Sequence, residues 1–309
     1  MIFNDKLQYN IQSLIGKFEI VKDHRDDSSR TGVIEIKAQD KRMFIKIHNR
    51  LSRWSAEVYA YQNWMKVLSP YVPTLLHTFK GESFGIIISP IKGRTVNEYE
   101  INDIKKLMDI YYMAGKQLRK LHESYKGTYF GTPAADGTPF EKNVPTNPEY
   151  YISSSMESIL QSGYDSQILD NSDKKLAEWC IKNCGVFKNS FPVPTNWDFS
   201  QNNWMVDENG IFTGLIDFEN MLWGIDVDSF GVIIERYTYD KPSLRQAFFD
   251  GYGLENDTEK QLQIFITSVK TGIADVCYGS STKNERFEKL GRQLLSELKR
   301  TGCYKHSWS

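Results

Sequence analysis

Two aspartates and an asparagine in the second half of the sequence have the types and spacing that phosphoryl transfer requires. Asp198 is followed five residues later by Asn203, and Asp217 comes after a short segment that contains a strong hairpin-turn signal, Asn209-Gly210. Phosphoryl transfer needs metal ions on the phosphates and a carboxylate that orients the attacking hydroxyl. Asp198 would orient the hydroxyl. Asn203 and Asp217 would supply the oxygen ligands that Mg²⁺ prefers.

The motifs around these residues resemble those of the aminoglycoside phosphotransferase family, which shares the protein-kinase-like fold with choline and hygromycin B kinases. The catalytic loop of that family runs His-Gly-Asp, four residues and Asn, and here it reads Asn196-Trp197-Asp198 and Asn203. The metal motif is present as Ile216-Asp217-Phe218-Glu219. Asn in place of His keeps donor and acceptor capacity. The resemblance implies that Asp198 is catalytic and that Asn203 and Asp217 hold Mg²⁺.

A lysine and a glutamate upstream fit the same pattern. Lys46 lies in the apolar run Met43–Ile47, and Glu57 follows eleven residues later, at helical spacing from Trp54 and Tyr61. A carboxylate beside an apolar helix stripe needs a cationic partner, because an unpaired buried charge is costly. Lys46 is the obvious candidate, and the resemblance implies that this pair holds the α- and β-phosphates of ATP. A solvent-facing lysine and a glutamate at the rim of the core are the alternative.

The remaining nucleotide contacts are predicted by position. The polar segment His24–Gly32 would be the phosphate loop, in which Ser28 and Ser29 offer donors to phosphate. An ordinary hairpin turn is the alternative for this segment. The resemblance implies that the Ser89 carbonyl and the Ile91 amide bind adenine. The expected nucleotide is therefore ATP, bound with Mg²⁺.

Acidic residues are concentrated after the metal motif. Residues 217–258 contain nine acidic side chains against three basic ones. Such a surface attracts cations, and we assign Asp226, Asp228 and Glu235 to a cationic acceptor. The resemblance implies a small-molecule hydroxyl acceptor, an aminoglycoside-type antibiotic or a related aminocyclitol or sugar, and hence a role in antibiotic resistance. A solvated acidic face is the alternative.

The pattern of apolar residues changes near residue 92. Before it, short alternating runs predict strands, together with one helix over 52–68. After it, apolar residues recur every three or four positions, which predicts helices. A hairpin over 204–216 interrupts this helical part. We therefore predict an α+β, two-lobed protein-kinase-like fold.

The two predicted lobes have different tasks. Residues 1–92 would form a small, β-rich N-terminal lobe that binds the nucleotide. Residues 93–309 would form a larger, mainly helical C-terminal lobe that carries the catalytic residues and binds the acceptor.

Composition argues against several other classes of protein. The net charge of −1 gives no bulk attraction to nucleic acid. The longest apolar stretch, around Ile86–Ile88, is too short to span a membrane, and Asp5 and Lys6 interrupt any secretory signal. The four cysteines lack metal-ligand spacing, which predicts free thiols in a reducing compartment. We therefore predict a cytoplasmic protein that binds neither nucleic acid nor membranes.

Two other functions are compatible with the same residues. A metabolic kinase for choline, a sugar or an amino alcohol would carry the same motifs. A pseudokinase, which binds nucleotide without transferring phosphate, is favoured by the altered His-Gly pair and by the single glycine of the phosphate segment. The presence of Lys46, Glu57, Asp198 and Asp217 opposes it. We expect an enzyme, a phosphotransferase with an alcohol group as acceptor.

Overall fold

The computed structural model describes residues 5–25, 31–236, 238–254 and 257–301, and the chain divides into two compact units. Each unit is assembled from three segments. The first unit consists of Met1–Glu100, Thr132–Lys142 and Asn202–Met221. The second consists of Ile101–Gly131, Asn143–Gln201 and Leu222–Ser309. The lobe boundary at residues 92 and 93 stays a prediction.

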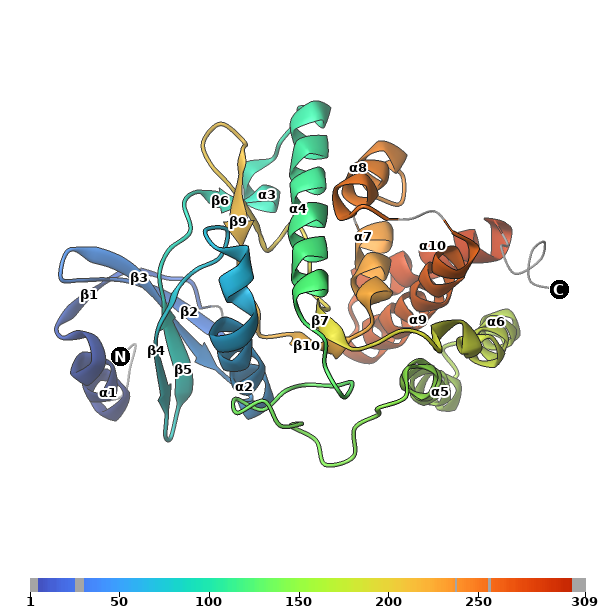
Figure 1. The fold of residues 1–309 in the computed structure, drawn as a ribbon, viewed down its shortest axis with the longest axis horizontal. Coiled ribbons are helices and arrows are strands. Elements are labelled where there is room, and N and C mark those ends of the chain that lie inside the picture. Colours follow the sequence, from blue (N-terminus) through green and yellow to red (C-terminus); the bar gives the residue numbers. More distant parts are fainter. Residues whose placement is uncertain (1–4, 26–30, 237, 255–256, 302–309) are drawn as a thin grey trace. The chain divides into compact units, whose positions relative to one another are not determined.

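A five-stranded antiparallel sheet forms the body of the first unit, with its strands in the order β1-β2-β3-β5-β4 (Figure 1). Its strands are β1 (Phe18–Asp23), β2 (Gly32–Ala38), β3 (Lys41–His48), β4 (Leu75–Lys80) and β5 (Phe84–Ile88). Gln39 and Asp40 form the tight turn between β2 and β3, both with positive φ. The sequence predicts strands over residues 18–23, 33–38, 43–47 and 84–88, where β1, β2, β3 and β5 lie, whereas β4 was not predicted.

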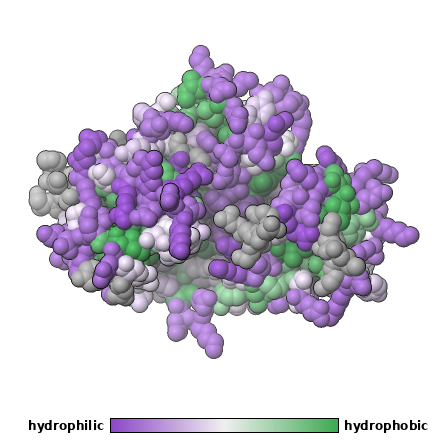
Figure 2. Space-filling view, turned by 180° about the vertical axis from the view of Figure 1, so that it is seen from behind, coloured by the Kyte–Doolittle hydropathy of each residue, from purple (hydrophilic) through white to green (hydrophobic). Residues whose placement is uncertain are grey.

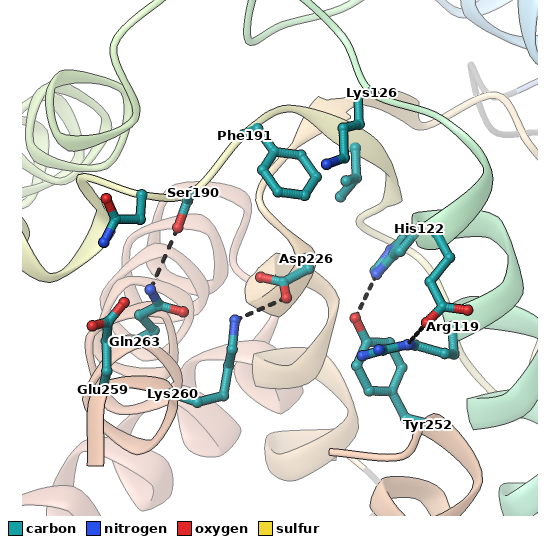
Figure 3. Close-up of a pocket in the computed structure, with 13 residues that line it drawn as sticks. Arg119, His122, Lys126, Ser190, Phe191, Asp226, Tyr252, Glu259, Lys260 and Gln263 are labelled. Atoms are coloured by element: carbon teal, nitrogen blue, oxygen red, sulfur yellow. Dashed lines mark hydrogen bonds and ion pairs between the residues drawn. The ribbon is translucent and has the colours of Figure 1, made fainter. Parts of the chain in front are cut away.

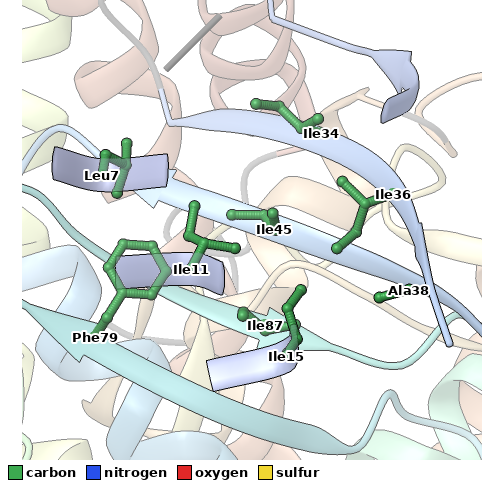
Figure 4. Packing of buried hydrophobic residues seen from close by; sticks show 9 residues of the cluster. All are labelled: Leu7, Ile11, Ile15, Ile34, Ile36, Ala38, Ile45, Phe79 and Ile87. Atoms are coloured by element: carbon green, nitrogen blue, oxygen red, sulfur yellow. The ribbon is translucent and has the colours of Figure 1, made fainter. Parts of the chain in front are cut away.

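The helix α1 (Asp5–Ile15) covers one face of this sheet (Figure 4). Leu7, Ile11 and Ile15 recur every four residues, so they share one side of the helix. They pack on apolar side chains of the strands, which are Ile34, Ile36, Ala38, Ile45, Phe79 and Ile87. Each buried Leu or Ile contributes about 1.5–3 kcal/mol to stability. This helix was not expected from the sequence.

The helix α2 (Leu51–Tyr59) contacts the opposite face of β3. It continues through a π-helical turn (Ala60–Trp64) and a 3₁₀ turn (Met65–Leu68), which together span the predicted helix. Side chains alternate along a strand. Ile45 therefore joins the cluster under α1, whereas Lys46 and His48 meet Glu57 of α2. Two polar side chains of β3, Lys46 and His48, therefore contact the same carboxylate, that of Glu57.

A second, three-stranded sheet completes the first unit. It orders β6 (Arg94–Thr95), β8 (Trp204–Val206) and β9 (Phe212–Leu215), and the short helix α3 (Val96–Tyr99) follows β6. The predicted hairpin is present between β8 and β9. The Asp207 carboxylate accepts hydrogen bonds from the amides of Asn209 and Ile211 at 2.9 and 3.0 Å, and Gly210 has φ 75°.

The second unit is mainly helical. Its helices are α4 (Ile104–Ser124), α5 (Pro148–Asp165), α6 (Asn171–Lys182), α7 (Phe230–Arg236), α8 (Pro242–Tyr252), α9 (Thr258–Thr282) and α10 (Glu285–Thr301). Short 3₁₀ turns occur at Cys184–Phe187 and Asp226–Ser229. The helix α4 packs against α8, and α9 packs against α10 (Figure 1). A Cβ on Gly291 would lie 2.5 Å from the Gly272 carbonyl oxygen, so this glycine permits the close approach of α9 and α10.

One small sheet lies within the helical part. It pairs β7 (Val193–Asn196) with β10 (Met221–Gly224), and neither strand was predicted. All four residues of each strand are buried. The strand β7 matters for the site because it ends at the residue that begins the catalytic-loop motif.

The face drawn in Figure 2 is mostly hydrophilic, and its hydrophobic residues form separate small groups. Among the described residues, no helix combines the length and the apolar character needed to cross a membrane. Cys180, Cys184 and Cys277 carry free thiols.

Candidate active site

The first unit brings Lys46, Glu57 and Asp217 together. The Lys46 ammonium lies 2.7 Å from Glu57 Oε1 and 2.9 Å from Asp217 Oδ1. Burial alone would lower the pKa of Lys46, but the Asp217 and Glu57 carboxylates outweigh burial and hold that pKa above its ordinary value. Lys46 is therefore a fixed positive charge. The side chain of Glu57 is fully buried, whereas that of Asp217 is 34% exposed and can reach a ligand.

Glu57 is the centre of this network. Its Oε1 accepts hydrogen bonds from Lys46 Nζ and, at 3.3 Å, from the Phe218 amide, and its Oε2 lies 2.6 Å from His48 Nε2. Burial would raise the pKa of Glu57, but Lys46 and His48 outweigh it and lower that pKa to about 2. The carboxylate is therefore ionised and ties β3 to the segment that follows β9.

The two predicted metal ligands lie at the two ends of the hairpin, Asn203 before β8 and Asp217 after β9. The Ile216 amide donates to the Asn203 carbonyl oxygen at 2.9 Å, which joins the start of the hairpin to its end. Asp217 has φ 64°, a left-handed conformation that is uncommon for residues other than glycine and is frequent at functional sites. Its carboxylate and the amide oxygen of Asn203 are hard donors of the kind that Mg²⁺ takes, so this donor set fits the metal. Arg53 pairs with Glu219 at 2.8 Å and braces the segment that follows β9.

The predicted adenine contacts lie where β5 ends. The Ser89 amide donates to the Thr74 carbonyl at 2.9 Å, and the Ser89 hydroxyl accepts from the Thr74 amide at 2.8 Å. Ile91 lies two residues before Gly93, whose φ is 106° and where a Cβ would lie 1.8 Å from the Val206 carbonyl oxygen. This close contact explains the glycine. Ser28 and Ser29 lie outside the described residues.

Asp198 belongs to the second unit, two residues after β7 ends. Its amide donates to Asn196 Oδ1 at 2.9 Å, and the Ser200 hydroxyl donates to its Oδ1 at 3.3 Å. Asn196, which replaces the histidine of the motif, is buried, and its carbonyl accepts from the Ser229 hydroxyl at 3.2 Å. Asn196 therefore fixes the turn that presents Asp198. Trp197 is 56% exposed, so much of the residue that replaces the glycine of the motif lies in solvent.

An arginine that the sequence reasoning missed lies within electrostatic range of Asp198. Arg236, at the end of α7, donates to both carboxylate oxygens of Asp275, with a shortest distance of 2.9 Å. Burial works to lower the pKa of Arg236, but Asp275 outweighs it, with a smaller contribution from Asp198, and the pKa is raised. No sequence motif marks Arg236. It is the basic residue that follows Glu235 in the acidic region.

The sequence has a family match that agrees with this geometry. The model of the phosphotransferase enzyme family, APH, matches residues 21–264. The chain belongs to this family. It is therefore a phosphotransferase, and the matched range contains Lys46, Glu57, Asp198 and Asp217. No curated protein sequence matches the chain.

The fold of this APH-family chain is shared by solved structures at low sequence identity. A thermostable variant of aminoglycoside phosphotransferase APH(4)-Ia, in ternary complex with AMP-PNP and hygromycin B, aligns with a TM-score of 0.71 at 11% identity, over 96% of this chain and 99% of that one. The gentamicin complex of APH(2″)-IIa aligns at 0.63 and 15%, over 95% and 96%. ADP-bound APH(2″)-Ib aligns at 0.61 and 16%, over 95% and 97%. The predicted kinase-like fold, with a β-sheet lobe and a helical lobe, is confirmed.

In this APH-family chain, two of the three residues assigned to the acceptor are buried. Asp228 accepts hydrogen bonds from Lys270 Nζ at 2.6 Å and from the Ile225 amide at 3.0 Å. Burial, with the neighbouring Asp275 adding to its effect, raises the pKa of Glu235 to about 10, so this carboxyl is neutral at pH 7. Asp226 is more exposed and pairs with Lys260 at 2.9 Å. The assignment of these three residues to the acceptor stays a prediction.

Asp226 also lines a cavity of about 380 Å³ within the second unit (Figure 3). Three acidic and three basic side chains line it, namely Glu123, Asp226, Glu259, Arg119, Lys126 and Lys260. The buried His122 lines one side, where its Nδ1 lies 2.9 Å from the Tyr252 hydroxyl. Burial lowers the pKa of His122 to about 4, so the imidazole is neutral at pH 7. The balanced charges give this cavity no preference for a polycation.

Proposed function

We propose that the protein transfers the γ-phosphate of ATP, in a Mg²⁺-dependent reaction, to a hydroxyl of a small molecule. The acceptor proposed is an aminoglycoside-type antibiotic or a related aminocyclitol or sugar. One observation carries the proposal. Lys46 is held between a buried carboxylate, Glu57, and a partly exposed one, Asp217. A buried ammonium fixed beside an accessible carboxylate suits a site for phosphate groups and their metal ion.

The residues of this chain divide the work as follows. Lys46, braced by Glu57, binds the phosphates, and the main chain at Ser89 and Ile91 binds adenine. Asn203 and Asp217 hold Mg²⁺, which neutralises charge on the phosphates when bound. Ser28 and Ser29 belong to the phosphate loop in this proposal.

Asp198 acts on the acceptor. Its carboxylate orients the attacking hydroxyl and takes its proton, and the Asn196 side chain and the Ser200 hydroxyl hold it in position. Arg236, which lies within electrostatic range of Asp198, adds an attractive positive charge near that carboxylate.

An acceptor panel tests the proposal. The full chain is incubated with MgATP and with aminoglycosides, sugars and amino alcohols, and ADP release is measured. We expect turnover with an aminocyclitol-containing acceptor and a fall in kcat of about 10²–10⁴-fold in Asp198→Asn, with nucleotide affinity unchanged. Asp109→Asn, on the exposed face of α4, is the matched control and should behave as wild type.

Three results would contradict parts of this proposal. Nucleotide binding without turnover on any acceptor would refute transfer. Turnover confined to choline or simple sugars would refute the aminoglycoside assignment. Undiminished turnover in Asp198→Asn would refute the role of that residue.

A further inference from the structure

A buried histidine lies beside the lysine and glutamate of the nucleotide site. His48 follows Lys46 by two residues on β3, so both side chains leave the same face of the strand. The side chain of His48 is fully buried, and its Nε2 lies 2.6 Å from Glu57 Oε2. Glu57 is ionised and can only accept, so Nε2 carries the proton and donates it to the carboxylate.

This hydrogen bond completes the set that orients Glu57. Oε1 is directed to Lys46 Nζ and to the Phe218 amide, and Oε2 is directed to His48. Donors on both oxygens prevent the carboxylate from rotating. Because the Phe218 amide directly follows Asp217, the orientation of Glu57 also sets the main chain at the proposed metal ligand.

We propose that His48 is a positioning residue for phosphoryl transfer. By donating to Oε2 it keeps Oε1 of Glu57 on Lys46 and on Phe218, and so holds the ammonium and the Asp217 segment in register for the nucleotide. The inference rests on the proposed function, and it adds a third member to the Lys46–Glu57 pair.

A metal site is the other reading of this cluster, because ligand atoms of His48, Glu57 and Glu219 lie within 4.8 Å of one another. The contacts argue against it. Both Glu57 oxygens already accept hydrogen bonds, one of them from an ammonium, and Glu219 Oε1 accepts from Arg53 at 2.8 Å. A cation placed here would be repelled by Lys46 and Arg53.

Two amide substitutions separate positioning from mere packing. In His48→Gln the side-chain nitrogen is as many bonds from Cα as Nε2 is, so it can donate to Glu57, whereas the nitrogen of His48→Asn stops short. Titration with a fluorescent ATP analogue and Mg²⁺ should give wild-type affinity within about twofold for Gln and about tenfold weaker binding for Asn. The same pair of substitutions at His122, the buried histidine of the second unit, is the control and should leave this affinity unchanged.

The outcomes distinguish this inference from the proposed function. Equal affinity of the Asn variant, the Gln variant and wild type overturns the role of His48 while the proposed function stands. Absence of nucleotide binding in wild type overturns both. If the Asn variant does not fold, ¹⁵N-histidine spectra of the wild-type chain decide. A downfield Nε2–H resonance that moves when MgATP is added supports the role, and an unprotonated Nε2 overturns it.

Discussion

Asp228 is the residue at which a structural role and an acceptor-binding role make opposite predictions. Its side chain is 1% exposed, and its Oδ1 lies 2.6 Å from Lys270 Nζ. Its Oδ2 accepts from the Ile225 amide at 3.0 Å and from the Tyr151 hydroxyl at 3.2 Å. Asp228→Asn preserves the shape of the side chain but removes its charge, which leaves the Lys270 ammonium, 11% exposed, without this carboxylate.

The magnitude follows from burial. Removing one partner of a buried ion pair costs about 3–5 kcal/mol, because the other charge stays desolvated. In a unit of this size each kcal/mol lowers Tm by roughly 2–4 °C, so Tm should fall by about 10 °C. Asp226→Asn is a matched control two residues away. Its pair with Lys260 has side chains 24% and 27% exposed, and such a pair contributes only about 0–1 kcal/mol.

Urea unfolding and acceptor kinetics together provide the assay. We expect Asp228→Asn to unfold at lower urea concentration with an unchanged acceptor KM. The double variant Asp228→Asn, Lys270→Met should recover stability, because it removes the unpaired ammonium. If Asp228→Asn is as stable as wild type and has a raised acceptor KM, the structural role is refuted. The result would then support Asp228 as an acceptor-binding residue.

Two further substitutions test the buried carboxyls through pH. Glu57 has a folded-state pKa of about 2 against an ordinary 4.5, so it stabilises the fold above pH 4.5 and loses that contribution as pH falls toward 2. Glu57→Gln should therefore cost about 3 kcal/mol at pH 7 and less at pH 4, as urea midpoints would show; a constant difference would contradict this. Glu235 has a folded-state pKa of about 10, so the unfolded chain ionises first and wild-type stability falls as pH rises from 4.5 toward 10. The stability of Glu235→Gln relative to wild type should therefore increase between pH 5 and pH 8, and parallel pH profiles would argue against a buried neutral carboxyl.

The elements that the sequence predicts well are those with strong local signals. The strand that carries Lys46 has a short apolar run, Met43–Ile47, and the hairpin has its Asn-Gly turn. Glu57 was predicted to meet Lys46 because a charge on an apolar helix stripe demands a partner, and the two lie 2.7 Å apart. Their roles in binding the nucleotide stay predictions.

The elements missed have weak or contrary local signals. Leu7, Ile11 and Ile15 do recur at helical spacing, but a helix of this length is marginally stable on its own. The packing of these side chains on the sheet stabilises α1. Pro194 lies inside β7, and proline argues against a strand because it cannot donate to the ladder. The strand β7 is stabilised by burial and by pairing with a distant segment, which no local pattern reveals.

The site residues missed depend on contacts between segments far apart in the sequence. Arg53 pairs with Glu219, 166 residues later, and Arg236 pairs with Asp275, 39 residues later. His48 had a readable signal, since it shares the strand face of Lys46. Asp228 and Glu235 show the converse. An acidic run in the sequence does not distinguish carboxyl groups in solvent from carboxyl groups that are buried in the fold, as Asp228 and Glu235 are.

The first unit is built from three separate segments of the chain, so its residues are synthesised at different times during translation. Asn202–Met221 belongs to this unit with Met1–Glu100. During synthesis Lys46 and Glu57 emerge early and can pair, whereas Asp217 is made only after the whole of α4, α5 and α6 of the second unit. A nascent chain stalled before residue 217 would therefore contain the Lys46–Glu57 pair without the Asp217 carboxylate. Completion of this site waits for about two thirds of translation.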